Sequence, residues 1–277
     1  MRYCSQYLGY EAMKLTTTGP KRPIKALVLG DPGSGKTGAI ASLIEAEYNV
    51  RMLDLDNGVD ILANVGSQAK IEKHFEFETL TDTMRTVAGK LVPAKATVWT
   101  RAISLLDNWK SASADLGAIT SWGSNEVLVI DSLSHLANAA LNFQLQMNAR
   151  LGQAPQQQDW YQGQQLLESL IQKLYDDAVK CNVIINCHLT FLGEENGPQR
   201  GYPATLGKAF SPKIGSYFNT VVMAKTSGSG AGERHKILTK SQGGVELKNS
   251  NPGKVKPEYP IETGLADLFK DLRGEIK

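Results

Sequence analysis

The chain has 277 residues, of which 42% are hydrophobic and 21% are charged, and its formal net charge is +2. This length allows one large domain or two small ones, and the sequence has no apolar run long enough to cross a bilayer. The net charge is too small to indicate a nucleic-acid partner unless basic residues cluster locally. The first residues lack the apolar core of a signal peptide, so we expect a cytoplasmic protein without a membrane partner.

We expect residues 1–22 to form an irregular arm, because Gly-Pro and Arg-Pro pairs interrupt regular structure before residue 24. From residue 23 onward short apolar runs alternate with helical stretches, which is typical of a mostly parallel sheet sandwiched between helices. Strands are predicted at residues 24–30, 50–56, 75–80, 126–132, 183–188 and 220–225. Helices are predicted at residues 37–47, 99–110, 136–150, 161–179 and 265–272. A C-terminal hairpin is predicted from 235–240 and 244–248, which gives one α/β domain over residues 23–277.

The stretch GDPGSGKT follows the first predicted strand and opens the first predicted helix. It matches the pattern G-x-x-x-x-G-K-[ST] at every position. Its glycines let consecutive backbone N–H groups point at an anion, and the helix dipole favours negative charge at the same place. We therefore predict an ATP site in which Lys36 reaches the β- and γ-phosphates and Thr37 binds Mg²⁺. The predicted nucleotide-binding residues are Gly30, Asp31, Pro32, Gly33, Ser34, Gly35, Lys36 and Thr37.

Asp131 ends the strongly apolar run EVLVID, at residues 126–131. Phosphoryl transfer depends on neutralising the phosphate charge, so a carboxylate on a strand beside the phosphate loop is expected. We predict that Asp131 binds Mg²⁺ together with Thr37. The alternative is that Asp131 only caps the helix that follows its strand.

Further candidate catalytic residues end two other predicted strands. Asp54 and Asp56 end the run VRMLDLD, at the edge of the sheet where open α/β folds bind ligands. We favour Asp56 as the residue that orients the attacking water, because the strand's period of two can turn Asp54 away. Asn186 and His188 end the run VIINCH and could contact the γ-phosphate. A buried, hydrogen-bonded histidine is the alternative for His188.

A long segment of little periodicity, residues 189–218, lies between the last two of these strands. It interleaves cations with aromatic rings, a composition that suits single-stranded DNA because cations contact phosphates and rings stack on bases. Its glycines would keep the segment mobile until a ligand orders it. The predicted DNA-binding residues are Arg200, Tyr202, Lys208, Phe210 and Lys213. The alternative is an ordinary surface loop whose rings pack on the body of the protein.

The runs GDPGSGKT, VRMLDLD, VLVIDSLSHL and VIINCHLT, the last followed by a long loop, resemble in order the RecA-like P-loop ATPases. The chain looks most similar to the small phage-encoded branch associated with single-strand annealing and recombination, over residues 24–225. The resemblance implies a RecA-like core and Asp56 as the catalytic carboxylate, where RecA has Glu. It also implies that residues 189–218 are a DNA-binding loop and that Lys248 reaches the nucleotide of a neighbouring subunit.

Three functions are compatible with these patterns. The first is a Mg²⁺-dependent ATPase that forms a ring or filament on single-stranded DNA in phage recombination, annealing or replication, with a single-strand-binding protein as a further candidate partner. It would act in the host cytoplasm. The second is a regulatory or assembly ATPase that binds a protein and not DNA. The third is a small-molecule kinase, which is disfavoured because residues 151–165 contain no arginine for a lid over the acceptor.

Overall fold

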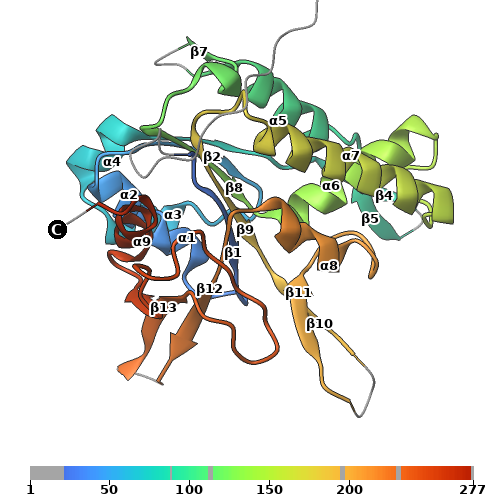
Figure 1. Ribbon diagram of the computed structural model, residues 1–277. Coiled ribbons are helices and arrows are strands. Elements are labelled where there is room, and N and C mark those ends of the chain that lie inside the picture. The colour runs from blue at the N-terminus through green and yellow to red at the C-terminus, as the bar shows by residue number, and fades with distance from the viewer. Residues whose placement is uncertain (1–21, 88, 112–114, 194–196, 229–231, 276–277) are drawn as a thin grey trace, which may run out of the picture.

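The computed structural model describes residues 22–275, except 88, 112–114, 194–196 and 229–231. The expected N-terminal arm therefore lies outside the described residues, apart from Arg22. An eight-stranded sheet crosses the molecule in the order β14-β13-β12-β1-β9-β8-β2-β3, with helices on both of its faces (Figure 1). The expected α/β fold, a mostly parallel sheet between helices, is confirmed.

Six of the eight strands, from β12 to β3, run parallel, and β13 and β14 continue the sheet antiparallel at one edge. The strands of this sheet are β1 (Lys25–Leu29), β2 (Asn49–Asp54), β3 (Phe75–Thr79), β8 (Glu126–Asp131), β9 (Asn182–Cys187), β12 (Thr220–Ser227), β13 (Arg234–Leu238) and β14 (Glu258–Pro260). Each of the six predicted strands is present, and no end differs from its expected position by more than two residues. The parallel arrangement brings the carboxyl ends of β1, β2, β8 and β9 to one edge.

The helices that cover the sheet are α1 (Lys36–Ala39), α2 (Ala41–Glu45), α3 (Asp60–Val65), α4 (Gln68–His74), α5 (Val98–Asp107), α6 (Leu133–Met147), α7 (Gln157–Tyr175), α8 (Ser211–Ile214) and α9 (Gly264–Arg273). Single 3-10 turns occupy Ile119–Ser121 and Gly215–Tyr217. The helix expected at residues 37–47 is interrupted at Ile40, and the sequence did not indicate α3 and α4. The other predicted helices begin or end within about four residues of their expected limits.

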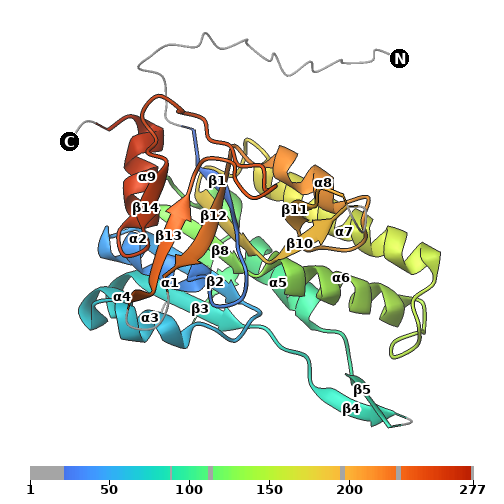
Figure 2. The same cartoon turned by 90° about the horizontal axis from the view of Figure 1, so that it is seen from below.

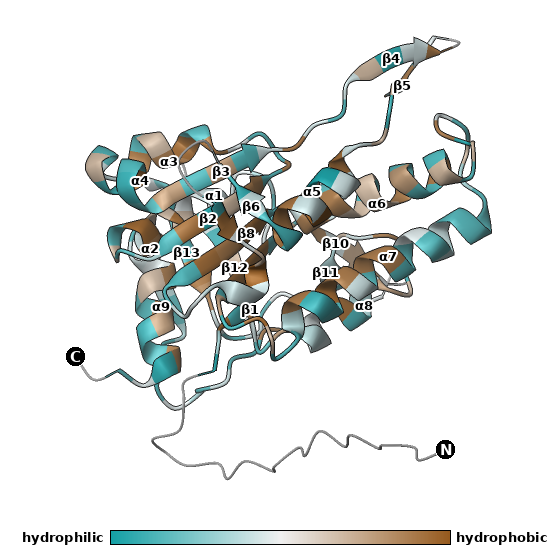
Figure 3. Cartoon of the chain, turned by 90° about the horizontal axis from the view of Figure 1, so that it is seen from above, coloured by the Kyte–Doolittle hydropathy of each residue, from teal (hydrophilic) through white to brown (hydrophobic). Residues whose placement is uncertain are grey.

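Both faces of the sheet are apolar because, in the parallel strands other than β3, neighbouring residues enter different cores. Leu27 and Leu29 of β1 pack with the buried residues of α5, α6 and α7, whereas Ala26 and Val28 pack with those of α1, α2 and α9. A strand buried on both faces reads as a continuous apolar run, which explains why these strands were visible in the sequence. Figure 3 shows the resulting brown, hydrophobic strands between helices whose outer surfaces are largely teal.

Three short antiparallel pairs lie outside the main sheet. The pair β4 (Met84–Val87) and β5 (Lys90–Pro93) projects from the body, as Figures 2 and 3 show. The pair β6 (Trp109–Lys110) and β7 (Asp115–Gly117) follows α5. The pair β10 (Leu189–Leu192) and β11 (Arg200–Pro203) occupies the segment after β9. None of the three was predicted, because short two-stranded ribbons carry weak periodicity.

Two expectations need correction. Residues 189–218 are not without regular structure, since they contain β10, β11 and α8. The expected pairing of 235–240 with 244–248 is also wrong, because β13 pairs with β12 and β14. Gly243 and Gly244 have φ values of +60° and +76°, and this left-handed turn directs the chain to Gly201, whose N–H donates to the Gly244 carbonyl. Within the described residues, no helix is both long and apolar enough to span a membrane.

Candidate functional site

The loop of residues 30–37 leads from the carboxyl end of β1 into α1. Gly33 and Gly35 have φ values of +75° and +91°, which favour glycine. A Cβ atom on Gly30 would lie 2.7 Å from the Ala224 carbonyl oxygen and 2.4 Å from Ser34 Oγ, so the first glycine is required by close packing. Asp31, Pro32 and Gly33 are exposed at the crest of the loop, where an anion can approach the backbone.

Lys36 lies inside the curl of this loop and is 6% exposed. Its Nζ donates hydrogen bonds to the carbonyl oxygens of Gly30 and Asp31, both at 2.9 Å. Burial lowers the pKa of the Lys36 ammonium, while the carboxylates of Asp131 and Asp56 oppose this shift. The ammonium is therefore held at the loop, and a bound phosphate would have to replace the two carbonyl contacts.

The two predicted metal ligands are in direct contact. Thr37 Oγ1 donates a hydrogen bond of 2.6 Å to Asp131 Oδ2, and Asp131 is 1% exposed. Burial raises the pKa of Asp131 even though the Thr37 hydroxyl favours its ionised form. The other carboxylate oxygen, Oδ1, makes no hydrogen bond of normal geometry within the described part of the chain. A hydroxyl oxygen and a carboxylate oxygen are ligands that Mg²⁺ prefers, so this pair fits the expected ion.

Asp56 and His188 also meet at this edge of the sheet, as their positions at strand ends predict. Asp56 Oδ2 lies 3.1 Å from His188 Nε2, and Ser132 Oγ donates to Asp56 Oδ1 at 2.7 Å. A second imidazole, His135 Nδ1, contacts the same Oδ1. Partial burial disfavours the charged form of Asp56, but the hydrogen bonds from His135 and Ser132 outweigh it and lower the Asp56 pKa to about 2.

Asp54, the alternative to Asp56, lies elsewhere. It is fully buried, its Oδ1 accepts the Gly58 N–H at 3.1 Å, and its Oδ2 accepts the Thr79 hydroxyl at 3.4 Å. These bonds shape the turn after β2 and join it to β3. Both oxygens of Asp54 are thus used within this turn, and the role of Asp56 as the residue that orients water stays a prediction.

Sequence reasoning missed two histidines at the site. His135 follows Asp131 by four residues, and the first turn of α6 carries it back over the strand end. This spacing in IDSLSH is the signal that could have found it. His235, on β13, packs against Gly35, where an added Cβ would lie 3.3 Å from the ring. Only the position of β13 beside β12 brings His235 there, and the sequence carries no signal of this pairing.

The predicted DNA-binding residues differ in their exposure. Arg200, Lys208 and Lys213 are exposed, and Tyr202 is half-buried. Phe210 is 4% exposed and belongs to the core, so the prediction that its ring stacks on a base is wrong for this conformation. Phe191 on β10 is 47% exposed and was not predicted. Alternation along β10 turns this ring outward, but the strand itself was not visible in the sequence.

Lys248 lies away from the phosphate loop of its own chain. Its backbone N–H and carbonyl pair with Val221 at 3.0 and 2.8 Å, and its Nζ donates to the Ser216 carbonyl at 3.4 Å. Val221 stands in register with Leu27, two residues before the end of β1. The expected contact of Lys248 with a neighbouring subunit's nucleotide stays a prediction.

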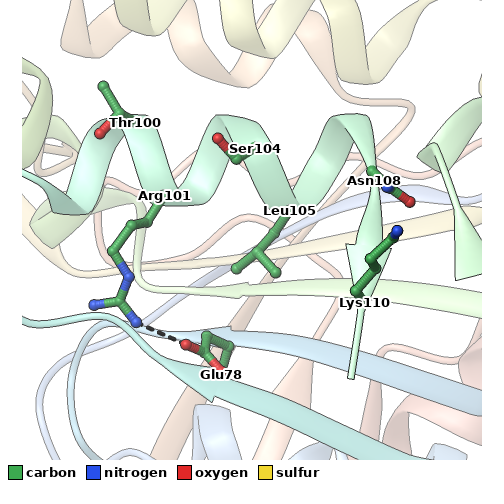
Figure 4. Close-up of a pocket in the computed structure, with 7 residues that line it drawn as sticks. All are labelled: Glu78, Thr100, Arg101, Ser104, Leu105, Asn108 and Lys110. Atoms are coloured by element: carbon green, nitrogen blue, oxygen red, sulfur yellow. Dashed lines mark hydrogen bonds and ion pairs between the residues drawn. The ribbon is translucent and has the colours of Figure 1, made fainter. Parts of the chain in front are cut away.

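A shallow groove lies between β3 and α5 (Figure 4). Arg101 and Glu78, which form an ion pair at 2.6 Å, both line it. The other residues along the groove are Thr100, Ser104, Leu105, Asn108 and Lys110. None of these is a predicted site residue, so the groove is separate from the candidate nucleotide site.

Comparison with known proteins gives one family match. A family described as an AAA domain matches residues 22–250, which is most of the chain. No curated protein matches the sequence. Among solved structures, RadB recombinase is 12% identical, with 87% of this chain and 89% of that chain covered and a TM-score of 0.46.

Two further structures show a similar degree of likeness. For a KaiC-like protein from Pyrococcus horikoshii OT3 the identity is 15%, 87% of each chain is covered, and the TM-score is 0.42. For the flagellar accessory protein FlaH from Methanocaldococcus jannaschii the identity is 9%, 86% of this chain and 84% of that chain are covered, and the TM-score is 0.40.

Proposed function

Because the chain belongs to the AAA domain family, we propose that it is a Mg²⁺-dependent ATPase that acts on single-stranded DNA. The observation that carries the proposal is the hydrogen bond of 2.6 Å between Thr37 Oγ1 and Asp131 Oδ2. It puts a hydroxyl and a carboxylate oxygen beside a loop whose glycines and helix start can bind phosphate. The pair lies at the carboxyl edge of a parallel sheet, where ligands of such folds bind.

In the proposed mechanism, backbone N–H groups of residues 30–37 bind the phosphates of ATP. Lys36 leaves its two carbonyl partners and contacts the β- and γ-phosphates. Thr37 and Asp131 would hold Mg²⁺, which when bound neutralises part of the phosphate charge. The pKa of about 2 keeps Asp56 ionised and makes it a poor proton acceptor at neutral pH. Its proposed role is therefore to orient the attacking water and not to take a proton from it.

The DNA part of the proposal is supported by the segment that follows His188. Arg200, Lys208 and Lys213 are exposed cations on this segment, and cations of this kind contact the phosphates of a single strand. His188 is joined directly to β10, and its Nε2 lies 3.1 Å from Asp56 Oδ2. A strand bound to the segment could therefore shift His188 and change how Asp56 holds water. This connection would make ATP turnover depend on DNA.

The task we propose for this ATPase is recombination, annealing or replication in a phage, inside the host cytoplasm. Assembly into a ring or filament would bring Lys248 to the nucleotide of a neighbouring subunit, and a single-strand-binding protein is a further candidate partner. The second candidate function is a regulatory or assembly ATPase that binds a protein instead of DNA. It is favoured by Met84, Val87 and Leu91, which are 46–71% exposed on the projecting β4–β5 pair.

The test is ATP turnover of the wild type and of Lys36→Ala, each with Mg²⁺ and with or without a single-stranded oligonucleotide. We expect the wild type to turn over ATP, Lys36→Ala to lose turnover, and the oligonucleotide to stimulate the wild type. The double variant Lys208→Ala/Lys213→Ala should lose stimulation and bind the oligonucleotide with a weaker salt dependence. The control Lys240→Ala removes an exposed cation elsewhere and should retain both.

The same experiment separates the two candidate functions. If the protein turns over ATP at a rate that the oligonucleotide does not change, the result would support the protein-binding ATPase and contradict the proposed action on DNA. Retention of a specific protein by the wild type in the absence of DNA, lost when Leu91 is replaced by Asp, would support that second function directly. Wild type without turnover under any of these conditions would contradict both.

A further inference from the structure

Asp56 lies between two imidazole rings that come from different elements. His135 is in the first turn of α6, and His188 follows β9 directly. His135 Nδ1 contacts Asp56 Oδ1, and His188 Nε2 lies 3.1 Å from Asp56 Oδ2. The ligand atoms of these three residues all lie within 4.8 Å of one another. The neighbouring positions of β2, β8 and β9 in the sheet therefore assemble a compact set of two nitrogen donors and one carboxylate.

This set differs chemically from the Thr37–Asp131 pair. Mg²⁺ prefers oxygen ligands, whereas imidazole nitrogen suits zinc and other first-row transition metals. Two histidines and one carboxylate form a common three-ligand set for such ions, and a fourth position remains for water. The side chains of Asp56, His188 and His135 are 18%, 23% and 52% exposed, so an ion from solvent can reach them.

Hydrogen bonds hold the Asp56 carboxylate and the backbone at His188. Ser132 Oγ donates to Asp56 Oδ1 at 2.7 Å and lies 3.3 Å from His135 Nδ1. The backbone N–H of His188 donates to Ser134 Oγ at 3.2 Å. Partners of this kind orient metal ligands and raise metal affinity. The turn that follows Asp131 thus holds the Asp56 carboxylate and the backbone at His188, whereas His188 Nδ1 makes no hydrogen bond within the described residues.

We propose that Asp56, His135 and His188 bind one transition-metal ion of the Zn²⁺ class. The site is distinct from the Mg²⁺ ligands Thr37 and Asp131, although both lie at the same edge of the sheet. Binding of this ion does not require ATP or its hydrolysis, so the inference goes beyond the proposed function. An ion there would draw Asp56 away from water and give the ATPase a means of sensing metal.

The test uses the full chain carrying Cys4→Ser. This substitution removes a thiol that can bind Co²⁺ and that lies outside the residues that the structure describes. The protein is stripped with a chelator, and Co²⁺ is then added without nucleotide, with Mg²⁺ in excess to fill oxygen sites. We expect one Co²⁺ per chain, with visible absorption typical of four- or five-coordinate cobalt, and displacement of the cobalt by Zn²⁺. Zn²⁺ should also raise the temperature of thermal unfolding.

Variants at the two histidines decide whether these residues are the ligands. His135→Ala and His188→Ala should each weaken Co²⁺ binding by about 100-fold or more and abolish the thermal shift by Zn²⁺. His135 is half exposed, so its variant should fold and be interpretable alone, as circular dichroism will check. The matched control is His74→Ala, because His74 pairs with Asn49 at the far end of β2.

The outcomes are separable from those of the ATPase test. The proposal is overturned if the folded wild type binds no Co²⁺, or if His135→Ala and His188→Ala both keep wild-type affinity. An inactive ATPase that still binds one Co²⁺ through these residues would leave the metal site standing. If the protein hydrolyses ATP but binds no Co²⁺, the proposed metal site is wrong and the proposed ATPase activity is unaffected.

Discussion

The hydroxyl of Thr37 gives the buried Asp131 carboxylate its hydrogen bond of 2.6 Å. Burial raises the pKa of Asp131, and the hydrogen bond from the Thr37 hydroxyl opposes this shift by favouring the ionised form. We predict that Thr37→Val lowers the free energy of unfolding by about 1–3 kcal/mol, because a buried acceptor loses its donor. Urea unfolding at pH 7 measures the change, and loss of Mg²⁺-dependent nucleotide binding should accompany it.

Two further threonine variants make this prediction specific. Thr37→Ser keeps the hydroxyl and should retain most of the stability and the nucleotide binding. Thr100→Val removes an exposed threonine hydroxyl that donates to the carbonyl of Thr97, at the start of its own helix, and should change stability by less than about 0.5 kcal/mol. If Thr37→Val and Thr100→Val change the free energy of unfolding equally, the Thr37–Asp131 hydrogen bond does not stabilise the fold more than an exposed hydrogen bond does.

At the scale of elements, the parallel strands could be predicted because their burial on both faces leaves a strong mark in the sequence. Runs such as EVLVID and VIINC are apolar without alternation, and polar residues appear where the strands end. This is why Asp131, Asp56 and His188 could be assigned to one edge from the sequence alone. Parallel strands bring their carboxyl ends together, so position at a strand end was sufficient.

Other elements depend on contacts between distant segments and leave weaker marks. Phe210 is an aromatic residue of the type that stacks on bases, but its ring is part of the core cluster that also contains residues of α6 and α7. The pair β10–β11 is a short ribbon, and β13 pairs with β12 and β14 instead of with residues 244–248. His235 reached Gly35 through that same pairing. Residue type and local periodicity do not indicate which distant segments pack together.

The first turn of α7 gives a prediction at the element scale. Asp159 accepts the backbone N–H of Gln156 at 2.8 Å in a capping box, and also pairs with Arg150. The Arg150 hydrogen bond lowers the pKa of Asp159 from 3.8 to about 2. A lowered pKa stabilises the fold above the unfolded pKa, and this contribution is lost as the pH falls through the folded value. Asp159→Asn should therefore destabilise the protein at pH 7, by an amount that shrinks between about pH 4 and pH 2.

Unfolding by denaturant across this pH range measures the effect. The control is Asp107→Asn, which removes a half-exposed ion pair with Lys173 and should change stability little at any pH. A stability difference between wild type and Asp159→Asn that stays constant down to pH 2 would show that the ionised Asp159 is not what holds the start of α7.

At the scale of the whole molecule, the family match and the packed core have different limits. The match ends at residue 250, but β14 and α9 lie beyond it. Leu265, Leu268 and Phe269 of α9 are fully buried in the core on the face of α1 and α2. Arg273 also donates to the Tyr48 hydroxyl at 2.5 Å and to Asn182 Oδ1 at 3.1 Å. These contacts thus tie α9 to α1 and α2 and to the amino ends of β2 and β9.

We therefore predict that residues 251–277 belong to the same cooperative unit as the phosphate loop, as expected for one domain over residues 23–277. Phe269→Ala should lower the free energy of unfolding by about 3–5 kcal/mol, because it leaves a cavity in a buried cluster. A chain ending at residue 250 should lose cooperative unfolding altogether. Leu91→Ala, at a side chain that is 71% exposed, is the control and should change stability by less than about 0.5 kcal/mol. If the shortened chain unfolds cooperatively and still binds ATP, α9 is not needed for folding, and residues 22–250 of the family match are sufficient as a folding unit.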